Sequence, residues 1–117
     1  MNNYLPTDYQ SFIHKSRYAK YYEGKGRESW GDTVDRYMDN IVGNLADTVT
    51  KKEIKEAILN LGVMPSMWSL MTAGKAAERD NTCMYNCSYL AVDDVKAFDE
   101  AMFILLCGTG VGFSVER

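Results

Sequence analysis

The sequence predicts an α/β chain, with a mainly helical region over residues 1–64 followed by one strand–helix–strand unit within residues 65–117. Two observations predict this order. Apolar residues recur at the spacing of a helix face through the first region, whereas the second holds a strongly apolar helix between two short runs with strand character. With 117 residues, the chain is long enough for one small domain and not for two.

The composition is that of a globular protein and excludes several function classes. The chain is 46% hydrophobic and 25% charged, which speaks against disorder. A net charge of −3 and a pI near 5.1 do not suit a protein that coats nucleic acid. No apolar run approaches the roughly 18–20 residues of a membrane span, and the opening MNNYLPTDYQ lacks the features of a signal peptide. With three cysteines, this predicts a cytoplasmic protein with reduced thiols that binds neither nucleic acid nor a membrane.

The first predicted helix begins at a capping box, in which Thr7 and Gln10 satisfy early backbone N–H groups. Residues 14–27 follow with five basic side chains, one acid and interleaved tyrosines, and Gly24 and Gly26 are placed to break the helix. Such a stretch suits either of two roles. It contacts RNA, or it is a solvated helix and turn whose tyrosines pack on a neighbour, which we favour.

A second helix is predicted from the cap residue Ser29 onward by one continuous apolar stripe. The stripe comprises Val34, Tyr37, Met38, Ile41, Val42 and Leu45. Thr50 and Glu53 form a further capping box, and Gly62 is placed to end the helix that follows. A short apolar helix is expected within residues 65–74. We expect the stripes of the two longer helices to form the core.

The second region predicts a βαβ unit. Residues 85–92 have strand character, and Asp93 and Asp94 can cap a helix that is apolar nearly all round, so we expect that helix to be buried on several sides. It stops at Gly108, and the alternating run GTGVGFSV predicts a second strand, parallel to the first because a helix connects them. A parallel pair buried on both faces needs further strands and cover. The pattern therefore predicts the front end of a larger fold.

Few residues can carry chemistry. His14 is the only histidine, so we expect a surface or packing residue and no histidine metal site. In extended chain Cys83 and Cys87 would be about 13 Å apart, beyond the roughly 7 Å between Cα atoms that a disulfide allows. A redox role for Cys87 therefore needs a partner from another strand or chain. We assign no role to Cys83 and expect Cys107 to be a buried, inert thiol.

The glycine cluster Gly108, Gly110 and Gly112 does not form a nucleotide-binding loop. The dinucleotide and P-loop motifs need a glycine-rich turn after a strand and before a helix, so that phosphate meets the helix N-terminus. Here the helix comes first, then the glycines, then the strand. Close backbone packing, or a ligand against a bare strand entrance, explains these glycines better.

Several short motifs follow one another in a distinctive order. They are PSM at residues 65–67, AG at 73–74, ERDN at 78–81, NCSYL at 86–90 and, after the apolar helix, GTGVGFSVER at 108–117. This combination resembles the N-terminal part of adenosylcobalamin-dependent (class II) ribonucleotide reductases, above all the monomeric, triphosphate-reducing kind and its phage-encoded relatives. The resemblance covers the whole chain, and the Asn-Cys strand followed by the GxGVGFSV strand is its most specific feature.

The resemblance implies that the chain begins a ten-stranded α/β barrel, in which Cys87 is one of two cysteines that reduce the substrate. In that family adenosylcobalamin generates a thiyl radical that abstracts the ribose 3′-hydrogen, and a thioredoxin-like reductant restores the oxidised cysteines. By position, Ser66 or Ser69, together with Asn86 and Ser88, are expected to bind the ribonucleotide. The resemblance assigns no cofactor-binding or metal-binding residue to this chain.

Several parts of the family's machinery have no counterpart in these residues: the radical cysteine, the second reducing cysteine, the C-terminal shuttle cysteines and the cobalamin-binding surface. We therefore expect the chain to act only when joined or docked to the remaining C-terminal part of the reductase. Two alternatives stay open. The chain belongs to an iron-dependent class I large subunit, or it is a stand-alone helical interaction module that binds a protein through residues 63–71 and the apolar AMFILLC helix. The sequence leaves open whether the substrate is a di- or triphosphate.

Overall fold

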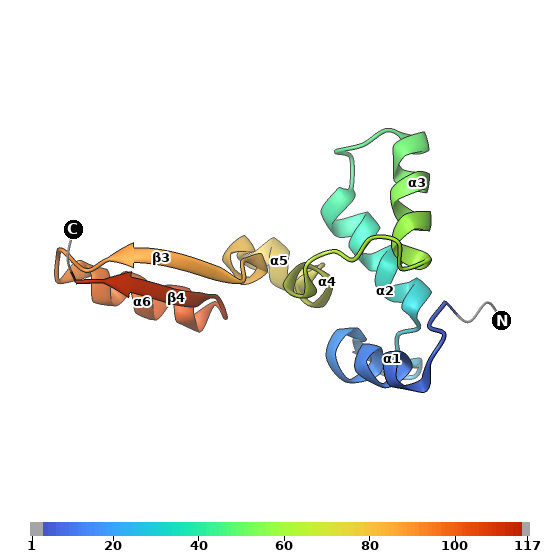
Figure 1. The fold of residues 1–117 in the computed structure, drawn as a ribbon, viewed down its shortest axis with the longest axis horizontal. Helices are drawn as coiled ribbons and strands as arrows, with labels where there is room; N and C mark the ends of the chain where they lie inside the picture. The colour runs from blue at the N-terminus through green and yellow to red at the C-terminus, as the bar shows by residue number, and fades with distance from the viewer. Residues whose placement is uncertain (1–3, 116–117) are drawn as a thin grey trace. The chain divides into compact units, whose positions relative to one another are not determined.

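The computed structural model describes residues 4–115, which form a mixed α/β chain with small sheets (Figure 1). These residues divide into two compact units, residues 4–74 and 75–115. The division follows Gly74 and not residue 64. The reason is that α4 (Met67–Thr72) belongs to the helical unit, where its Leu70 is fully buried in the core.

Helices and one short hairpin make up the first unit. Its other elements are α1 (Asp8–Ile13), η1 (His14–Tyr18), β1 (Tyr21–Tyr22), β2 (Gly26–Arg27), α2 (Trp30–Tyr37), η2 (Met38–Val42) and α3 (Thr48–Leu59). The capping box of Thr7 and Gln10 at α1 is confirmed, and Ser29 caps α2 as predicted, in a box with Asp32. Beyond η1 the chain folds back as the antiparallel hairpin β1–β2, which the sequence pattern did not predict.

The start and end of α3 differ from the prediction. Asp47 caps this helix, because its carboxylate accepts the backbone N–H of Thr50 at 3.2 Å, so the predicted capping box of Thr50 and Glu53 is wrong. At the other end Leu61, and not Gly62, takes the left-handed backbone conformation, with a φ of 60°. The helix thus ends one residue earlier than glycine placement alone indicates.

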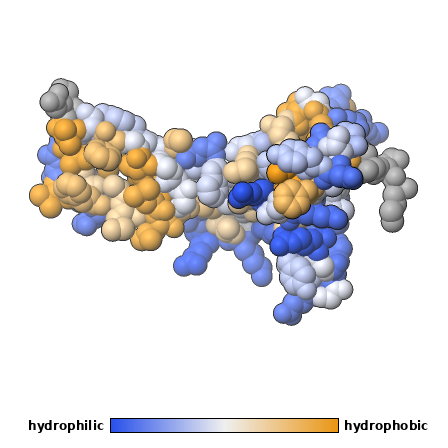
Figure 2. All heavy atoms as spheres, turned by 60° about the horizontal axis from the view of Figure 1, so that its bottom comes forward, coloured by the Kyte–Doolittle hydropathy of each residue, from blue (hydrophilic) through white to orange (hydrophobic). Residues whose placement is uncertain are grey.

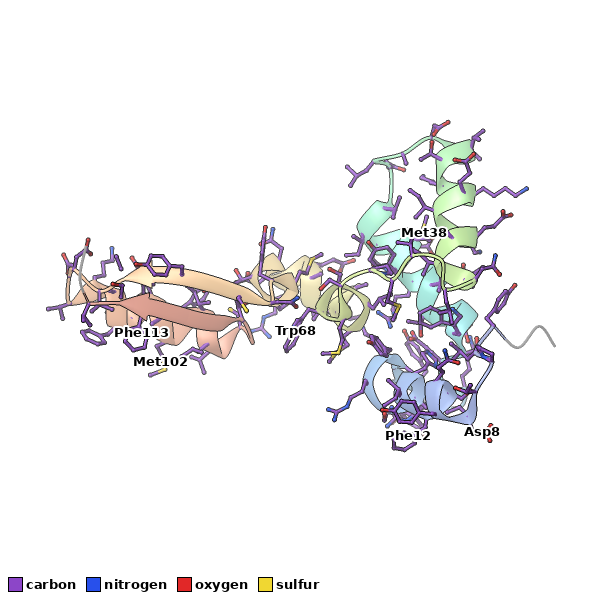
Figure 3. The ribbon with its side chains drawn as sticks, viewed as in Figure 1. Asp8, Phe12, Met38, Trp68, Met102 and Phe113 are labelled. Atoms are coloured by element: carbon purple, nitrogen blue, oxygen red, sulfur yellow. The ribbon has the colours of Figure 1, made fainter. Side chains whose placement is uncertain are left out.

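The core of the helical unit forms around α2, α3 and α4. Its buried members are Leu5, Trp30, Val34, Met38, Ile58 and Leu70. Met38 lies between α2 and α3 (Figure 3). The predicted stripe is confirmed from Val34 to Val42, but Leu45 is 88% exposed. The α-helix gives way to the π-helical turn η2, which ends at Val42, and Leu45 lies beyond that end.

A buried ion pair links distant segments of this unit. Arg36 donates from Nε to Glu28 Oε1 at 2.8 Å and from Nη2 to Glu28 Oε2 at 2.9 Å, and the two side chains are 8% and 3% exposed. The same guanidinium donates to the carbonyls of Tyr18, Leu70 and Ala73. Removing one partner of such a pair leaves an uncompensated buried charge, which generally costs about 3–5 kcal/mol. This pair therefore holds η1, α2 and α4 to one another.

His14 lies beside this ion pair and is buried, so its expected packing role is confirmed. Its Nε2 is 2.9 Å from Thr33 Oγ1, and the Thr33 hydroxyl donates to Glu28 Oε2 at 3.0 Å, so Nε2 carries the proton that bonds to Thr33. The ring meets Trp30 edge to face. Desolvation lowers the pKa of His14, against the opposing effect of the Glu28 carboxylate. Desolvation raises the pKa of Glu28, but hydrogen bonds from Arg36 and two further donors outweigh it and lower that pKa to about 2.

The second unit is the predicted βαβ unit, preceded by two short helical turns. Its elements are α5 (Lys75–Arg79), η3 (Asn81–Met84), β3 (Cys87–Ala91), α6 (Lys96–Leu106) and β4 (Gly110–Ser114). The strands are parallel, as predicted, and Cys87 lies opposite Gly110 and Ala91 opposite Ser114. Asp94 accepts the backbone N–H of Lys96 at 2.9 Å, which supports the predicted start of the helix.

Helix α6 is largely exposed in the described residues, and the burial on several sides that its sequence predicts needs cover beyond this βαβ unit. The exposed apolar side chains of α6 and β4 are Phe98, Met102, Phe103, Leu105, Leu106 and Phe113. Hydrophobic side chains gather over this unit in Figure 2, and Figure 3 labels Met102 and Phe113. Within residues 75–115 the helix has one strand pair to pack against, so only part of its apolar surface is covered. None of the helices in residues 4–115 combines the length and apolar character needed to cross a membrane.

We expect acid to destabilise the helical unit in two stages. A pKa that is lower in the folded than in the unfolded state means that the unfolded chain binds more protons, so stability falls as pH falls. For His14 the loss begins as pH drops through 6.5, and for Glu28 it begins below 4.5 and continues toward about 2. Urea unfolding followed by tryptophan fluorescence measures this, because Trp30 and Trp68 both belong to this unit.

The variant His14→Gln is the matched control for the first stage. It keeps a group that can hydrogen-bond to Thr33 but cannot titrate, so its urea midpoint should stay level from neutral pH to about 5, where the parent midpoint declines. If the urea midpoint falls equally with pH in the parent and in His14→Gln over that range, His14 is not the cause of the first stage.

Candidate functional site

Cys87 is the first residue of β3, and its thiol is exposed and not in a disulfide. In the parallel register Cys87 lies opposite Gly110, the first residue of β4. The helix between the two strands, α6, contacts both of them. The Cys87 thiol is thus held on paired backbone and not on a loop.

The strand pair has one covered face and one open face. Side chains alternate along a strand, so Ser88 and Leu90 share the face that α6 covers, where both are half-buried. Cys87 and Tyr89 point the other way and are exposed, Tyr89 by 71%. Their partners on β4 are Gly110 and Gly112, which add no side chain. The open face therefore presents a thiol and a phenol over bare glycine backbone.

Gly110 lies in close contact with the backbone and thiol of β3. A Cβ placed there would lie 3.3 Å from the carbonyl oxygen of Asn86 and 3.9 Å from the sulfur of Cys87. The N–H of Gly110 donates to the same Asn86 carbonyl at 3.0 Å, and the Ser88 hydroxyl donates to the Gly110 carbonyl at 3.2 Å. A side chain at residue 110 would stand beside the thiol, so the glycine keeps this side of the sulfur free.

The residues predicted to bind substrate separate into two groups. Asn86 and Ser88 flank Cys87, as the prediction requires; the Asn86 side chain is exposed, whereas Ser88 lies on the covered face and its hydroxyl serves the strand pairing. Ser66 and Ser69 belong to the helical unit. Ser66 precedes α4 and is exposed, and Ser69 lies within that helix and is half-buried.

The other two cysteines differ from their predictions. Cys83 lies in the 3₁₀ turn η3, so the chain from Cys83 to Cys87 is not extended throughout. Cys107 is half-buried and not fully buried. All three cysteines are free thiols.

Thr109 is a part of the site that the sequence did not indicate. It is 2% exposed, and its hydroxyl donates to the carbonyl oxygen of Thr82 at 2.6 Å. Gly108, with a φ of 94°, ends α6 as predicted and turns the chain toward β4. The buried hydroxyl thereby ties the segment before β3 to the start of β4. A threonine between two glycines has no pattern that marks such a contact.

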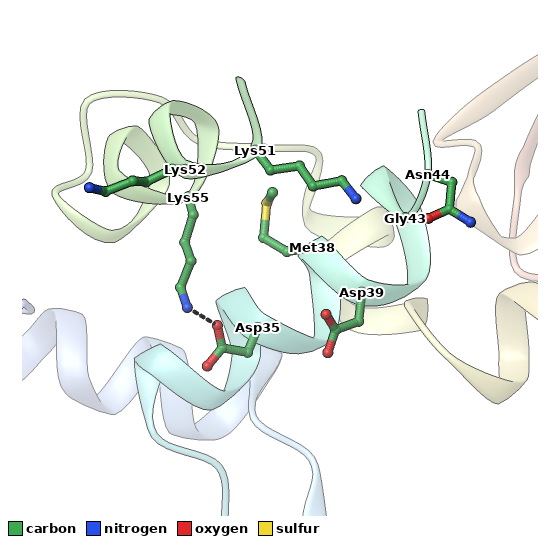
Figure 4. A pocket seen from close by; sticks show the side chains of 8 residues that line it. All are labelled: Asp35, Met38, Asp39, Gly43, Asn44, Lys51, Lys52 and Lys55. Carbon is green, nitrogen blue, oxygen red and sulfur yellow. Dashed lines mark ion pairs between the residues drawn. The ribbon is translucent and has the colours of Figure 1, made fainter. Parts of the chain in front are cut away.

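A separate pocket of about 410 Å³ lies between η2 and α3 of the helical unit (Figure 4). Its lining residues are Asp35, Met38, Asp39, Gly43, Asn44, Lys51, Lys52 and Lys55. Lys55 pairs with Asp35, and the hydrogen bond that Lys55 donates to the Asp35 carboxylate raises the pKa of Lys55. No cysteine, histidine or hydroxyl side chain lines the pocket, so it offers no nucleophile of these kinds, and its charges are of both signs.

Neither metal chemistry nor similarity assigns a function to the chain. Within residues 4–115, no three His, Cys, Asp or Glu side chains come together as metal ligands. Comparison with protein-family models, with curated proteins and with solved structures finds no significant match to this chain. The chemistry of the open face around Cys87 is therefore the basis for a functional proposal.

We expect a side chain at residue 110 to shield the Cys87 thiol. In Gly110→Val the new methyl groups would lie beside the sulfur, so alkylation of Cys87 by iodoacetamide should slow severalfold. Peptide mapping after timed labelling of the folded chain measures the rate at Cys87 separately from the other thiols.

Gly112→Val is the matched control, since residue 112 lies opposite Tyr89 and its Cβ would meet only the Ser88 carbonyl, at 3.7 Å. This variant should leave the alkylation rate of Cys87 within about a factor of two, because access to the thiolate governs the reaction. Equal slowing by both substitutions, or by neither, would show that Gly110 does not control access.

Proposed function

We propose that this chain supplies the first strands of a ribonucleotide reductase, with Cys87 as one of the two thiols that reduce the ribose. The observation that carries the proposal is the placement of Cys87. An exposed, unpaired thiol begins a parallel strand on the open face of a βαβ unit, over glycines that leave room beside it. The motif NCSYL around it, followed by GTGVGFSV, resembles the corresponding strands of class II reductases.

The proposed reaction exchanges the 2′-hydroxyl of a ribonucleotide for hydrogen. Two thiols together give up two electrons and two protons and become a disulfide; the carbon gains a hydrogen in place of the hydroxyl, which leaves as water. Cys87 is one thiol, and a cysteine on a further segment of the barrel is the other. A thiyl radical on a third cysteine removes the ribose 3′-hydrogen at the start and returns it at the end. A thioredoxin-like dithiol then reduces the disulfide by exchange.

The remaining barrel is the partner that the proposal requires. Cys87 and Tyr89 are exposed on the open face of β3, and α6 leaves large apolar side chains uncovered. Parallel sheets in proteins are covered on both faces, and contiguous exposed apolar surface marks an interaction site. Further strands beside β3 and β4, with helices against α6, would bury these groups. The unit would then be the beginning of the ten-stranded barrel. We expect the assembled enzyme in the cytoplasm, which for a phage-encoded chain is that of the host.

None of the described residues is assigned to adenosylcobalamin, which we expect the missing part of the enzyme to bind. His14, the chain's one histidine, is buried between Thr33 and Trp30 and is not free to bind a cofactor. The proposal therefore assigns cofactor binding to the partner and uses Cys87 only in the reducing step. Dependence of turnover on adenosylcobalamin, as opposed to an iron-bearing subunit, separates a class II enzyme from a class I large subunit.

Substrate contacts are assigned by position. Asn86, exposed and adjacent to Cys87, is the nearest predicted contact for the ribonucleotide. Ser88 positions the strand, and its proposed substrate role is weaker because its hydroxyl already donates to Gly110. Ser66 and Ser69 remain candidates for phosphate contacts from the helical unit.

A second candidate function rests on the exposed apolar side chains alone. Val63, Met64 and Met67 are exposed in the helical unit, as are the side chains of α6 in the other. A stand-alone module would bind a partner protein through such surfaces without any use of the thiol. The two functions are separated by the requirement for Cys87.

Cys87→Ser should abolish ribonucleotide reduction in the assembled enzyme while leaving assembly intact. A serine hydroxyl cannot be oxidised to a disulfide, so turnover should fall to background. The measurement is conversion of ribonucleotides to deoxyribonucleotides by the chain isolated together with its partner, assayed with a dithiol reductant, with and without adenosylcobalamin.

Cys83→Ser serves as the matched cysteine substitution, and it should retain turnover. If the Cys87→Ser complex reduces ribonucleotides at the parent rate, the proposal is wrong. If neither the parent complex nor the Cys87→Ser complex reduces ribonucleotides, and the two bind the partner equally well, the interaction module replaces the reductase as the function of this chain.

A further inference from the structure

Gly112, in the middle of β4, is a glycine that the chain's own packing does not require. Its φ lies outside the left-handed region, so any residue could adopt its backbone conformation. A Cβ placed there would meet only the Ser88 carbonyl oxygen, at 3.7 Å, which is an ordinary van der Waals contact. Glycine weakens the interior of a strand and often marks a place where a ligand or another backbone approaches closely. Gly112 therefore leaves space for a group that the described residues do not supply.

This space adjoins the side chain of Tyr89. Tyr89 is paired with Gly112 across the two strands, and it points to the open face, as does Cys87 two residues earlier. Side chains stand roughly perpendicular to a sheet, so the Tyr89 ring rises beside the bare backbone of β4. The residue is 71% exposed. One face of an aromatic ring is thus available next to the thiol.

Neither strand carries a charged side chain. Residues 87–91 are CSYLA and residues 110–114 are GVGFS, so these strands hold no lysine or arginine that could neutralise a phosphate beside the ring. The group that suits the space is therefore uncharged and flat, with one face against the tyrosine ring and an edge toward the backbone of β4. A nucleobase has this shape, and every base has a face that stacks on an aromatic side chain.

We propose that Tyr89 binds the nucleobase of the nucleotide whose ribose Cys87 reduces, with the base stacked on the tyrosine ring over Gly112. This inference rests on the proposed function and adds the residue that holds the base. Residues two apart on one face of a strand are separated by about 6.6 Å. A base is joined to C1′, the carbon next to the C2′ that is reduced, so the base can lie at Tyr89 while C2′ lies at Cys87. The phosphates then extend toward Asn86, away from the uncharged strands.

The test measures how well a nucleotide shields Cys87 from alkylation. The chain isolated together with its partner is incubated with dCDP or dCTP, which already lack the 2′-hydroxyl and so cannot oxidise Cys87 by turnover. Iodoacetamide is then added, and peptide mapping gives the rate of labelling at Cys87. The nucleotide concentration that halves this rate measures binding at the open face, whether or not the complex turns over.

We expect this half-shielding concentration to rise by at least about fivefold in Tyr89→Leu, because stacking between a base and an aromatic ring contributes on that scale. Gly112→Val should raise it as well, since the new side chain fills the space in which the base lies. Tyr89→Phe keeps the ring and should restore the parent value. Deoxyribose 5-phosphate, which has no base, should shield Cys87 equally in the parent and in Tyr89→Leu.

Tyr9→Leu is the matched control, because Tyr9 is 72% exposed and lies in the helical unit. It should leave the half-shielding concentration unchanged. Equal values for the parent and Tyr89→Leu, or no shielding of Cys87 in the parent complex, would overturn the inference. So would loss of partner binding in Tyr89→Leu, since Tyr89 would then belong to an interface. Failure of the reductase proposal would be seen separately, as ribonucleotide reduction that survives Cys87→Ser.

Discussion

The uncovered face of a parallel strand pair is the constraint on which the rest of the site depends. One helix connects β3 and β4 and covers one face of the pair. The other face is left either for a partner that covers it or for a functional site. In this chain that face carries the exposed thiol of Cys87 over Gly110. The apolar side chains of α6 are exposed for the same reason, because a single strand pair covers only part of the helix.

The helical unit is organised by a different interaction. The Glu28–Arg36 pair is buried, and its guanidinium satisfies carbonyls from three other positions in the chain. A buried charge pair is stable only when its remaining hydrogen-bonding capacity is met, as it is here. This unit can therefore be ordered by its own contacts, whereas the βαβ unit presents surface suited to a partner.

Local patterns predicted those features that a few neighbouring residues determine. The capping residues Thr7 and Ser29, the end of α6 at Gly108 and the parallel strand order all follow from short-range rules. Contacts between distant residues could not be read in this way. The cap of α3 is a local contact that was nevertheless assigned to the wrong residue, because the Asp47 carboxylate accepts the Thr50 N–H. A sequence does not state the register that sets Gly110 beside Cys87.

In the candidate site, too, local patterns predicted some features and missed those that depend on distant contacts. The sequence indicated Cys87, its need for a distant partner and the glycines of the second strand. It did not indicate that Ser88 lies on the covered face, nor that Thr109 binds the Thr82 carbonyl, because both depend on how the two strands pair. The approach of Cys107 to Asp80 also joins residues that are far apart in sequence.

As part of the proposed reductase, Cys87 would exchange electrons with a cysteine on another part of the enzyme. The most direct measurement stops the assembled enzyme with acid after a single turnover without external reductant and identifies the cysteine bound to Cys87 by tandem mass spectrometry. The account predicts a disulfide between Cys87 and a cysteine outside residues 1–117, formed in proportion to the deoxyribonucleotide produced. Deoxyribonucleotide formed while Cys87 stays a free thiol would contradict it.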